Sequence, residues 1–307
     1  MSCLQEPTTP HPPPLPPLPP PPLPKVCVSI KTPDLQKKSR KEDDIAAYLR
    51  VGRKALSFLK RQENEKDSAG KEQWFLSAYK EVIPVIQDGP QCGFVALQMV
   101  HSLMRGHKTS AVEAMIDWAV SKGFTKHGEM LSVNYMKSTA EDYCGLDCSV
   151  LHLEEKNGRS VMLNYLLQGL NLVIVYDDDK NHTPCLKDGH KAHWAVLTGF
   201  FLVLNTNPST CLKNLEHDSE HGFLYHCHAS EDVADNLAKI LSLDSVYVYG
   251  HHGKSRYAGI WRLDELFASN ANLTAVDPSK DCDYVIPEEG IAKTLRCRAL
   301  VIGKSTS

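Results

Sequence analysis

The segment that decides the fold of this chain reads Val-Ile-Gln-Asp-Gly-Pro-Gln-Cys-Gly-Phe-Val-Ala-Leu-Gln-Met and runs from Val85 to Met99. Its Gly-Pro pair interrupts any regular structure before it, and the apolar run from Phe94 to Met104 predicts a helix. Cys92 is therefore expected in the first turn of that helix. Unpaired N–H groups and the positive end of the helix dipole favour a thiolate there, and the thiolate is the nucleophilic form of cysteine.

A candidate base lies well downstream, in the segment His190-Lys-Ala-His193-Trp-Ala-Val-Leu-Thr-Gly199. His193 opens a β-branched and aromatic run that predicts a strand, and its imidazole is suited to accept the proton of Cys92. A cysteine at a helix N-terminus, followed along the chain by a histidine on a strand, is typical of a papain-like cysteine peptidase. His190 is the alternative base, because it lies three residues earlier.

Gln87 is the candidate oxyanion donor. It lies across the Gly-Pro turn from Cys92, so its side-chain amide and the Cys92 N–H are placed to hold the oxyanion of a tetrahedral intermediate. Gln91, next to the nucleophile, is the alternative. Papain-like enzymes also orient the histidine with an asparagine or aspartate. Asn207 is the candidate for that role and Asn205 competes with it, although both residues are also common in turns.

The composition limits the function classes. The chain has 307 residues with 34 basic and 37 acidic side chains, a balance that argues against nucleic-acid binding. It contains no apolar stretch of ~18 to 20 residues and no signal-peptide core, so we expect a cytoplasmic protein without a membrane span. The 10 cysteines are scattered and form no paired Cys-x-x-Cys set, so we expect reduced thiols and neither a metal nor another cofactor.

Proline dominates the segment from Pro10 to Pro24. Such a sequence forms neither a helix nor a core, and it predicts a disordered tail with a polyproline II rod that binds SH3, WW, EVH1 or profilin-type grooves. An inert spacer is the alternative. We expect three regions: a disordered proline-rich tail over 1–40, a helix and polar linker over 41–71, and a papain-like peptidase domain over 72–307.

Periodicity and turn residues predict the remaining elements. The expected helices cover 44–59, 111–120 with Ser110 as cap, 133–143, 160–168 and 232–241; the expected strands cover 148–153, 171–176, 245–249, 257–263, 281–287 and 298–302, with a strand pair over 193–204. Asp177 to Asp179 is interpreted as an exposed, solvated turn, and 205–231 as an insertion loop. Gly253-Lys-Ser255 is interpreted as a turn and not as a phosphate loop. Helices first and strands later predict an α+β fold with the active site in the cleft between them.

These motifs resemble the papain-like bacteriocin-processing peptidases and, more closely, the eukaryotic actin maturation proteases. The likeness rests on Gln87 to Gly93, on His190 to Val196, on Gly253-Lys-Ser followed by Trp261, Leu263 and Ser269-Asn270, and on the proline-rich N-terminus. The resemblance implies a cytosolic cysteine aminopeptidase that removes the acetylated N-terminal Met or Cys from immature actin. It also implies that the proline tract binds a profilin-type protein and so raises the effective concentration of actin near the enzyme.

Two alternatives remain open from the sequence. One is a non-enzymatic adaptor, in which a degenerate peptidase fold carries the polyproline ligand. The other is a different Cys-His acyl hydrolase or transferase, since Cys92 and His193 specify acyl transfer and leave the acyl group undetermined.

Overall fold

The computed structural model describes residues 40–63, 73–106, 111–154, 157–237, 246–280 and 282–303. The proline-rich tail predicted over 1–40, with its tract from Pro10 to Pro24, lies outside the described residues, and so does the expected cap Ser110. The first helix, α1, belongs to the same compact unit as the sheet.

Helices and strands are intermixed along the chain, not helices first and strands later as expected, and the sheet is mostly antiparallel, so the α+β class is confirmed. The helices are α1 (Arg40–Glu63), α2 (Cys92–Arg105), α3 (Val112–Ser121), α4 (Val133–Ser138) with a π turn to Tyr143, α5 (Gly158–Leu167), α6 (Glu231–Leu237), α7 (Leu263–Ala271) and α8 (Ile291–Thr294). The strands are β1 (Trp74–Tyr79), β2 (Cys148–His152), β3 (Asn171–Asp178), β4 (Pro184–Cys185), β5 (Ala192–Leu204), β6 (Glu216–His217), β7 (Leu224–His226), β8 (Val246–His252), β9 (Gly259–Arg262) and β10 (Arg298–Ile302).

The strands form one sheet in the order β2-β10-β3-β5-β1-β7-β6, with β8 paired to β5 and β9 paired to β8. Strand β5 pairs with β3 along its first half and with β1 along its second half, and β8 runs beside both halves. The change of partner occurs at Gly199, where a Cβ would lie 2.0 Å from the carbonyl oxygen of Ala78. Only glycine permits this close approach of two backbones.

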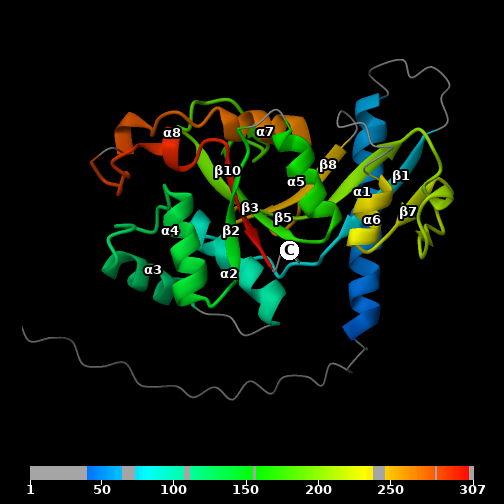
Figure 1. Cartoon of the computed structure of the whole chain (residues 1–307), viewed down its shortest axis with the longest axis horizontal. Helices are drawn as coiled ribbons and strands as arrows, with labels where there is room; N and C mark the ends of the chain where they lie inside the picture. Colours follow the sequence, from blue (N-terminus) through cyan, green and yellow to red (C-terminus); the bar gives the residue numbers. More distant parts are fainter. Residues whose placement is uncertain are drawn as a thin grey trace, which may run out of the picture. The chain divides into compact units, whose positions relative to one another are not determined.

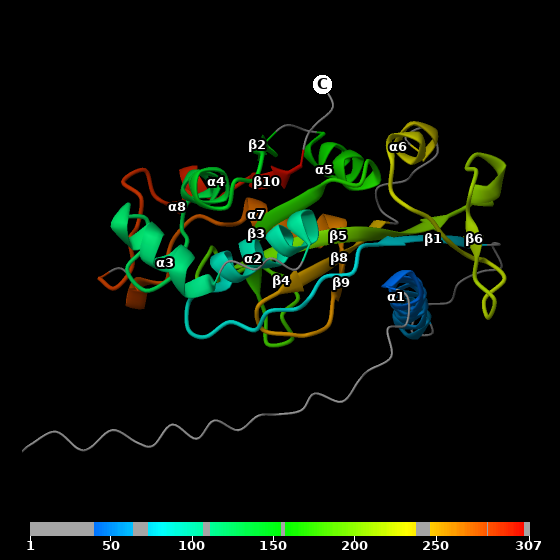
Figure 2. The same ribbon diagram turned by 90° about the horizontal axis from the view of Figure 1, so that it is seen from below.

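Alternating side chains of β3 and β5 contribute to two separate cores, because successive residues of a strand point to opposite faces. Tyr176 and Ala195 pack with α5, α6 and α7, whereas Val175 and Trp194 pack with α2, α3 and α4. A third core joins α1 to the far half of the sheet. Its buried members are Ala55, Leu56, Leu59, Phe75, Phe201, Leu224, Tyr247 and Tyr249. Figure 1 shows α2, α3 and α4 at one end of the sheet, and Figure 2 shows α1 and α6 on opposite sides of β1.

Three expectations about the elements were wrong. The segment from His193 to Leu204 lies within one strand and is not a pair, because Gly199 accommodates an irregularity in the pairing with β8 without a turn. The expected insertion loop contains β6 and β7, which extend the sheet. No strand forms over residues 282–287; the Val285 N–H instead donates to the carboxylate of Glu129 at 2.8 Å.

Candidate active site

Cys92 is the first residue of α2, as the Gly-Pro break predicted. Gln91 occupies the N-cap position and makes no side-chain cap, and Gly89 before it has a φ of 67°, which suits glycine. Cys92 is half-buried. The helix therefore directs the unpaired N–H groups of its first turn towards the thiol.

A cavity of about 170 Å³ brings the three predicted residues together. It is lined by Gln87, Pro90, Cys92, Glu129, Met130, Leu131, Ala192, His193, Trp194, Lys254 and Tyr284. Neither of the two alternatives, His190 and Gln91, belongs to this lining. The walls come from the α2 N-terminus, the start of β5 and the turn after β8, three segments far apart in the sequence.

His193 is the second residue of β5 and is buried, with 3% of its surface exposed. Its ring lies edge-on to Tyr176, with centroids 6.1 Å apart, and edge-on to His252, at 5.7 Å. Its Nε2 atom is buried without a hydrogen-bond partner among the described residues. Because an unsatisfied buried polar atom is costly, this nitrogen is a position where a proton or an orienting group would be stabilised.

The environment of the two groups favours their neutral forms. Burial raises the pKa of the Cys92 thiol, although the Trp194 N–H and the charge of Lys254 act in the opposite direction. Burial, followed by the charge of Lys254, lowers the pKa of His193 to about 3. Burial therefore opposes the thiolate that the helix N-terminus favours, and the resting thiolate stays a prediction.

Gln87 is fixed against the turn that follows β8. Its backbone N–H donates to the Gly253 carbonyl at 2.8 Å, and its side-chain Nε2 donates to the Gly89 carbonyl at 2.7 Å. A Cβ on Gly253 would lie 2.7 Å from Gln87 Oε1, so a larger residue there would displace the Gln87 side chain. A side-chain amide carries two N–H donors, so one remains for a ligand in the cavity.

A buried carboxylate lies near His193, where the sequence had indicated only a solvated turn. Asp178, the last residue of β3, is 5% exposed; its Oδ2 accepts hydrogen bonds from Lys254 Nζ at 2.7 Å and pairs with His182 Nδ1 at 3.0 Å. Burial alone would raise the pKa of Asp178, but the hydrogen bonds from Lys254 and His182 lower it. Its negative charge acts to raise the pKa of His193, against the effect of burial.

The neighbouring Asp177 has a different role. It is fully buried, and its carboxylate accepts N–H groups of Lys187, Gly189 and Lys191, each at 2.9 Å. These bonds hold the loop that leads into β5. The interpretation of this stretch as solvated was therefore wrong for both Asp177 and Asp178, because the strand β3 continues through them and buries both.

Asn207 and Asn205 do not orient His193. Asn207 lies beyond the opposite end of β5, where its Oδ1 accepts the Ser209 N–H at 3.0 Å and caps the turn over Pro208–Thr210. A strand rises about 3.3 Å per residue, which places the far end of β5 roughly 35 to 40 Å from His193. Both asparagines are turn residues here.

No group of three or more His, Cys, Asp and Glu side chains suited to a metal ion occurs in the described ranges. Nor does the described part of the chain contain a helix long and apolar enough to cross a membrane.

Comparison with known proteins adds the family. A family model described as "Actin maturation protease-like, C-terminal domain" matches residues 82–201, which include Gln87, Cys92, Asp178 and His193. The actin maturation protease of Danio rerio is 35% identical over 241 residues, which are 76% of each chain. The chain belongs to the actin maturation protease family.

Other members of the actin maturation protease family match at similar levels. The Bos taurus and Homo sapiens proteins are each 35% identical, over 75% and 71% of this chain and over 66% and 63% of their own lengths. Among solved structures, a putative C39-like peptidase from Bacillus anthracis covers 74% of this chain at 12% identity, with a TM-score of 0.36. That score is too low to establish a shared fold.

Asp178, His182, His252 and Lys254 are the neighbours of His193 that sequence reasoning missed. The sequence did contain a signal for Asp178, because an acidic residue ends the apolar run that precedes the histidine strand. When two such strands pair in antiparallel fashion, the end of the first lies beside the start of the second. Lys254 belongs to the Gly253-Lys-Ser255 turn. Its ion pair with Asp178 gives this turn a structural role that does not involve phosphate binding.

Proposed function

We propose that this chain is a papain-like cysteine aminopeptidase that removes the N-acetylated first residue, Met or Cys, from immature actin. The observation that supports it best is the shared cavity of Cys92, His193 and Gln87, at the junction of a helix N-terminus and a strand. The actin substrate is inferred from the relatives, which are actin maturation proteases.

His193 acts as a general base in this mechanism. It removes the thiol proton while Cys92 Sγ attacks the carbonyl carbon of the first residue, and the Cys92 N–H with Gln87 Nε2 stabilises the oxyanion. The imidazolium then donates its proton to the leaving amine as the peptide bond breaks. Water, deprotonated by the same imidazole, hydrolyses the thioester and frees Cys92. Asp178 stabilises the imidazolium electrostatically at each stage.

The size and lining of the cavity support removal of one residue. Ligand pockets commonly enclose about 300 to 1,000 Å³, so about 170 Å³ suits a single side chain with its acetyl group and not an extended chain. Met130, Leu131, Trp194 and Tyr284 give it apolar and aromatic walls, which suit a methionine or cysteine side chain.

We further infer a cytoplasmic enzyme whose peptidase domain covers residues 72–307, with α1 packed against it through a shared core. In this proposal the tract from Pro10 to Pro24 binds profilin or an SH3-type protein, and profilin would bring actin to the enzyme. Deletion of residues 10–24 should then raise KM for profilin-bound actin and leave cleavage of a short peptide unchanged.

The decisive experiment uses an actin N-terminal peptide, acetylated on its first residue. Mass spectrometry should show loss of one acetylated residue with the wild type and with Cys282→Ala, a variant of an exposed cysteine outside the cavity. Cys92→Ala should give no product. Cleavage by Cys92→Ala would exclude the mechanism, and no cleavage by any of the three proteins would favour the adaptor.

A further inference from the structure

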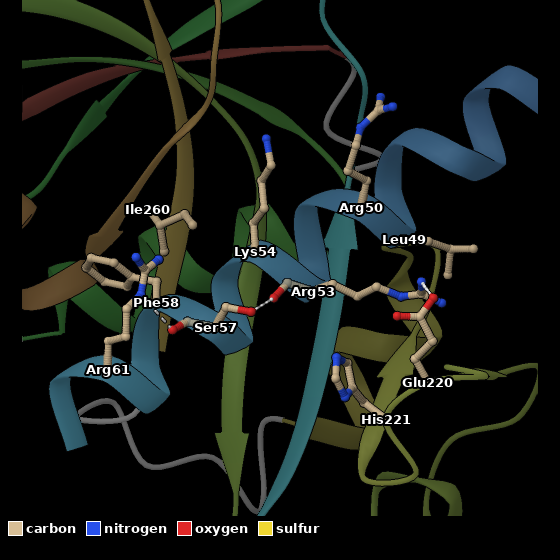
Figure 3. Close-up of a pocket in the computed structure, with 10 residues that line it drawn as sticks. All are labelled: Leu49, Arg50, Arg53, Lys54, Ser57, Phe58, Arg61, Glu220, His221 and Ile260. Carbon is tan, nitrogen blue, oxygen red and sulfur yellow. Dashed lines mark hydrogen bonds and ion pairs between the residues drawn. The ribbon is translucent and has the colours of Figure 1, made fainter. Parts of the chain in front are cut away.

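A long groove beside α1 is not used by the mechanism. Its two connected hollows, of about 820 and 460 Å³, share Arg50, Lys54 and Ile260. Figure 3 shows Arg50 and Lys54 projecting in one direction from α1, while Arg53 projects towards Glu220. The groove has both charge and apolar surface, because Phe58 and Ile260 lie between its basic side chains.

The groove is basic although the chain is acidic overall, with a net charge of −3. Arg50, Arg53, Lys54, Arg61 and Arg256 line it, against the acids Glu81 and Glu220. The ion pairs of Arg53 with Asp218 and Glu220 neutralise that guanidinium.

Four exposed cations remain; one of them, Arg61, donates a hydrogen bond from Nε to the Ser57 carbonyl. Arg50, Lys54 and Arg256 take part in no ion pair among the described residues, although Lys54 lies 4.9 Å from the centroid of the Tyr257 ring. Such a cluster attracts an anionic ligand.

Two segments of the chain line both the groove and the catalytic cavity. One contributes Pro84 to the groove and Gln87 to the cavity; the other contributes Lys254 to the cavity and Arg256 to the groove. The hydrogen bond from the Gln87 N–H to the Gly253 carbonyl, at 2.8 Å, joins the two segments into one wall. A chain that leaves the cavity along this wall therefore reaches the cations of α1.

The dimensions suit a peptide. Arg50, Lys54, Ser57 and Arg61 follow one stripe of α1, and at 1.5 Å per residue this stripe is about 16 Å long. An extended peptide spans that length with about five residues.

We propose that this groove binds an acidic polypeptide segment, namely the part of the substrate that follows the residue held in the catalytic cavity. The inference rests on the proposed function, because the peptidase cavity at the end of the groove favours a polypeptide over a nucleic acid. Acidic side chains pair with Arg50, Lys54 and Arg256, and apolar side chains between them contact Phe58 and Ile260.

The test measures binding without catalysis. Cys92→Ala protein is titrated into two labelled peptides of equal length that begin with acetyl-Met, one followed by Asp and Glu residues and the other by Asn and Gln. We expect the acidic peptide to bind at least tenfold more tightly, with a difference that shrinks at high salt. Adding Arg50→Gln, Lys54→Gln and Arg256→Gln should remove the difference.

The matched control adds Lys122→Gln, Lys213→Gln and Lys293→Gln, which remove the same charge from exposed positions outside the groove. The control should retain acidic selectivity. Equal binding of the two peptides, or equal loss in both triple variants, would overturn the proposal, as would displacement of the acidic peptide by an oligonucleotide that binds more tightly.

The outcomes also separate this inference from the proposed function. If wild-type protein cleaves neither peptide while the groove-dependent selectivity persists, only the proposed function fails. If wild-type protein cleaves both peptides with the same KM and the groove substitutions do not change it, only the groove assignment fails.

Discussion

Two buried histidines of this molecule lie near buried carboxylates with basic partners, and they differ in how their networks are completed. His226 on β7 is 1% exposed; its Nε2 pairs with Asp218 at 3.1 Å, and Asp218 also accepts a hydrogen bond from Arg53 of α1 at 2.8 Å. His193 on β5 has no such bond. The nearby Asp178 is engaged by Lys254 and His182, and His193 Nε2 stays without a partner in the described structure.

The difference distinguishes a histidine that fixes structure from one available for chemistry. The first network joins α1 to the β6–β7 end of the sheet, and α1 approaches so closely that a Cβ on Gly52 would lie 2.6 Å from His226 Cε1. The second leaves an imidazole that is oriented by packing and free to exchange a proton. Each ring keeps one buried nitrogen without a partner among the described residues, His226 Nδ1 and His193 Nε2, so the distinction rests on the ion pair of His226 with Asp218 and on the cavity that His193 shares with Cys92.

The largest effect should come from substituting each of the two histidines in turn. His193→Gln should lower kcat by 10³-fold or more, because proton transfer and the imidazolium are lost, while thermal stability stays close to wild type. His226→Gln should lower the melting temperature and leave the kcat of the folded protein unchanged. Steady-state cleavage of the acetylated peptide and thermal unfolding of both variants measure this. Full activity in His193→Gln would contradict the assignment of His193 as the general base.

Gln87→Ala should come next, with a loss in kcat on the order of 10²-fold from removal of one oxyanion donor. Gln91→Ala is the matched control, since Gln91 lies outside the cavity lining and makes no side-chain cap. Its kcat should stay within twofold of wild type, in the same peptide assay. Equal losses in the two variants would remove Gln87 from the site.

Asp218→Asn should act on stability alone. The folded-state pKa of Asp218 is lowered to about 2; burial opposes this shift, and hydrogen bonds from Arg53, the Glu220 N–H and His226 produce it. Because the shift is about 2 pH units, the charged carboxylate contributes about 2 kcal/mol at neutral pH. That contribution is present above pH ~4 and is lost as the pH falls towards 2. Urea unfolding of wild type and variant should show a smaller difference in the free energy of unfolding at pH 3 than at pH 7. An equal difference at the two pH values would contradict this prediction.

Asp178→Asn should give the smallest loss, about tenfold in kcat, because its charge supports the His193 imidazolium through space without a direct hydrogen bond. Since a negative charge raises the pKa of His193, the variant should also shift the acidic limb of kcat/KM to lower pH. Lys254→Met should shift that limb to higher pH, because the lysine charge lowers the same pKa. A tenfold loss with an unmoved pH profile would assign Asp178 a purely structural role.

Local sequence signals predicted the parts of the site that local chemistry determines. The Gly-Pro break and the apolar run after Cys92 determine where α2 begins, and the β-branched run after His193 determines β5. Asn207 was misassigned because the choice depends on which strand end faces the cavity, a property of the whole sheet. Asp178 was misread because three consecutive aspartates suggest solvent, and only pairing of β3 with β5 buries two of them.

Strand β1 was missed for a related reason. Trp74–Tyr79 is an apolar run of only 6 residues, too short for periodicity to distinguish a strand from a helix, and it pairs with the second half of β5, more than a hundred residues later. The basic stripe of α1 also escaped notice, since charged positions at helical spacing are usual on a solvated face. Its significance depends on the neighbouring turn with Arg256, which the sequence does not bring near.

The position of β10 has a consequence for biosynthesis. Residues Arg298–Ile302 insert between β2 and β3, and they contribute to both cores of the sheet. During translation β2 and β3 emerge long before this strand, each with an unpaired edge, and β3 carries the carboxylate beside the candidate base. The nascent chain therefore stays incompletely paired until residue 302 has left the ribosome, and catalytic competence should appear only at that moment.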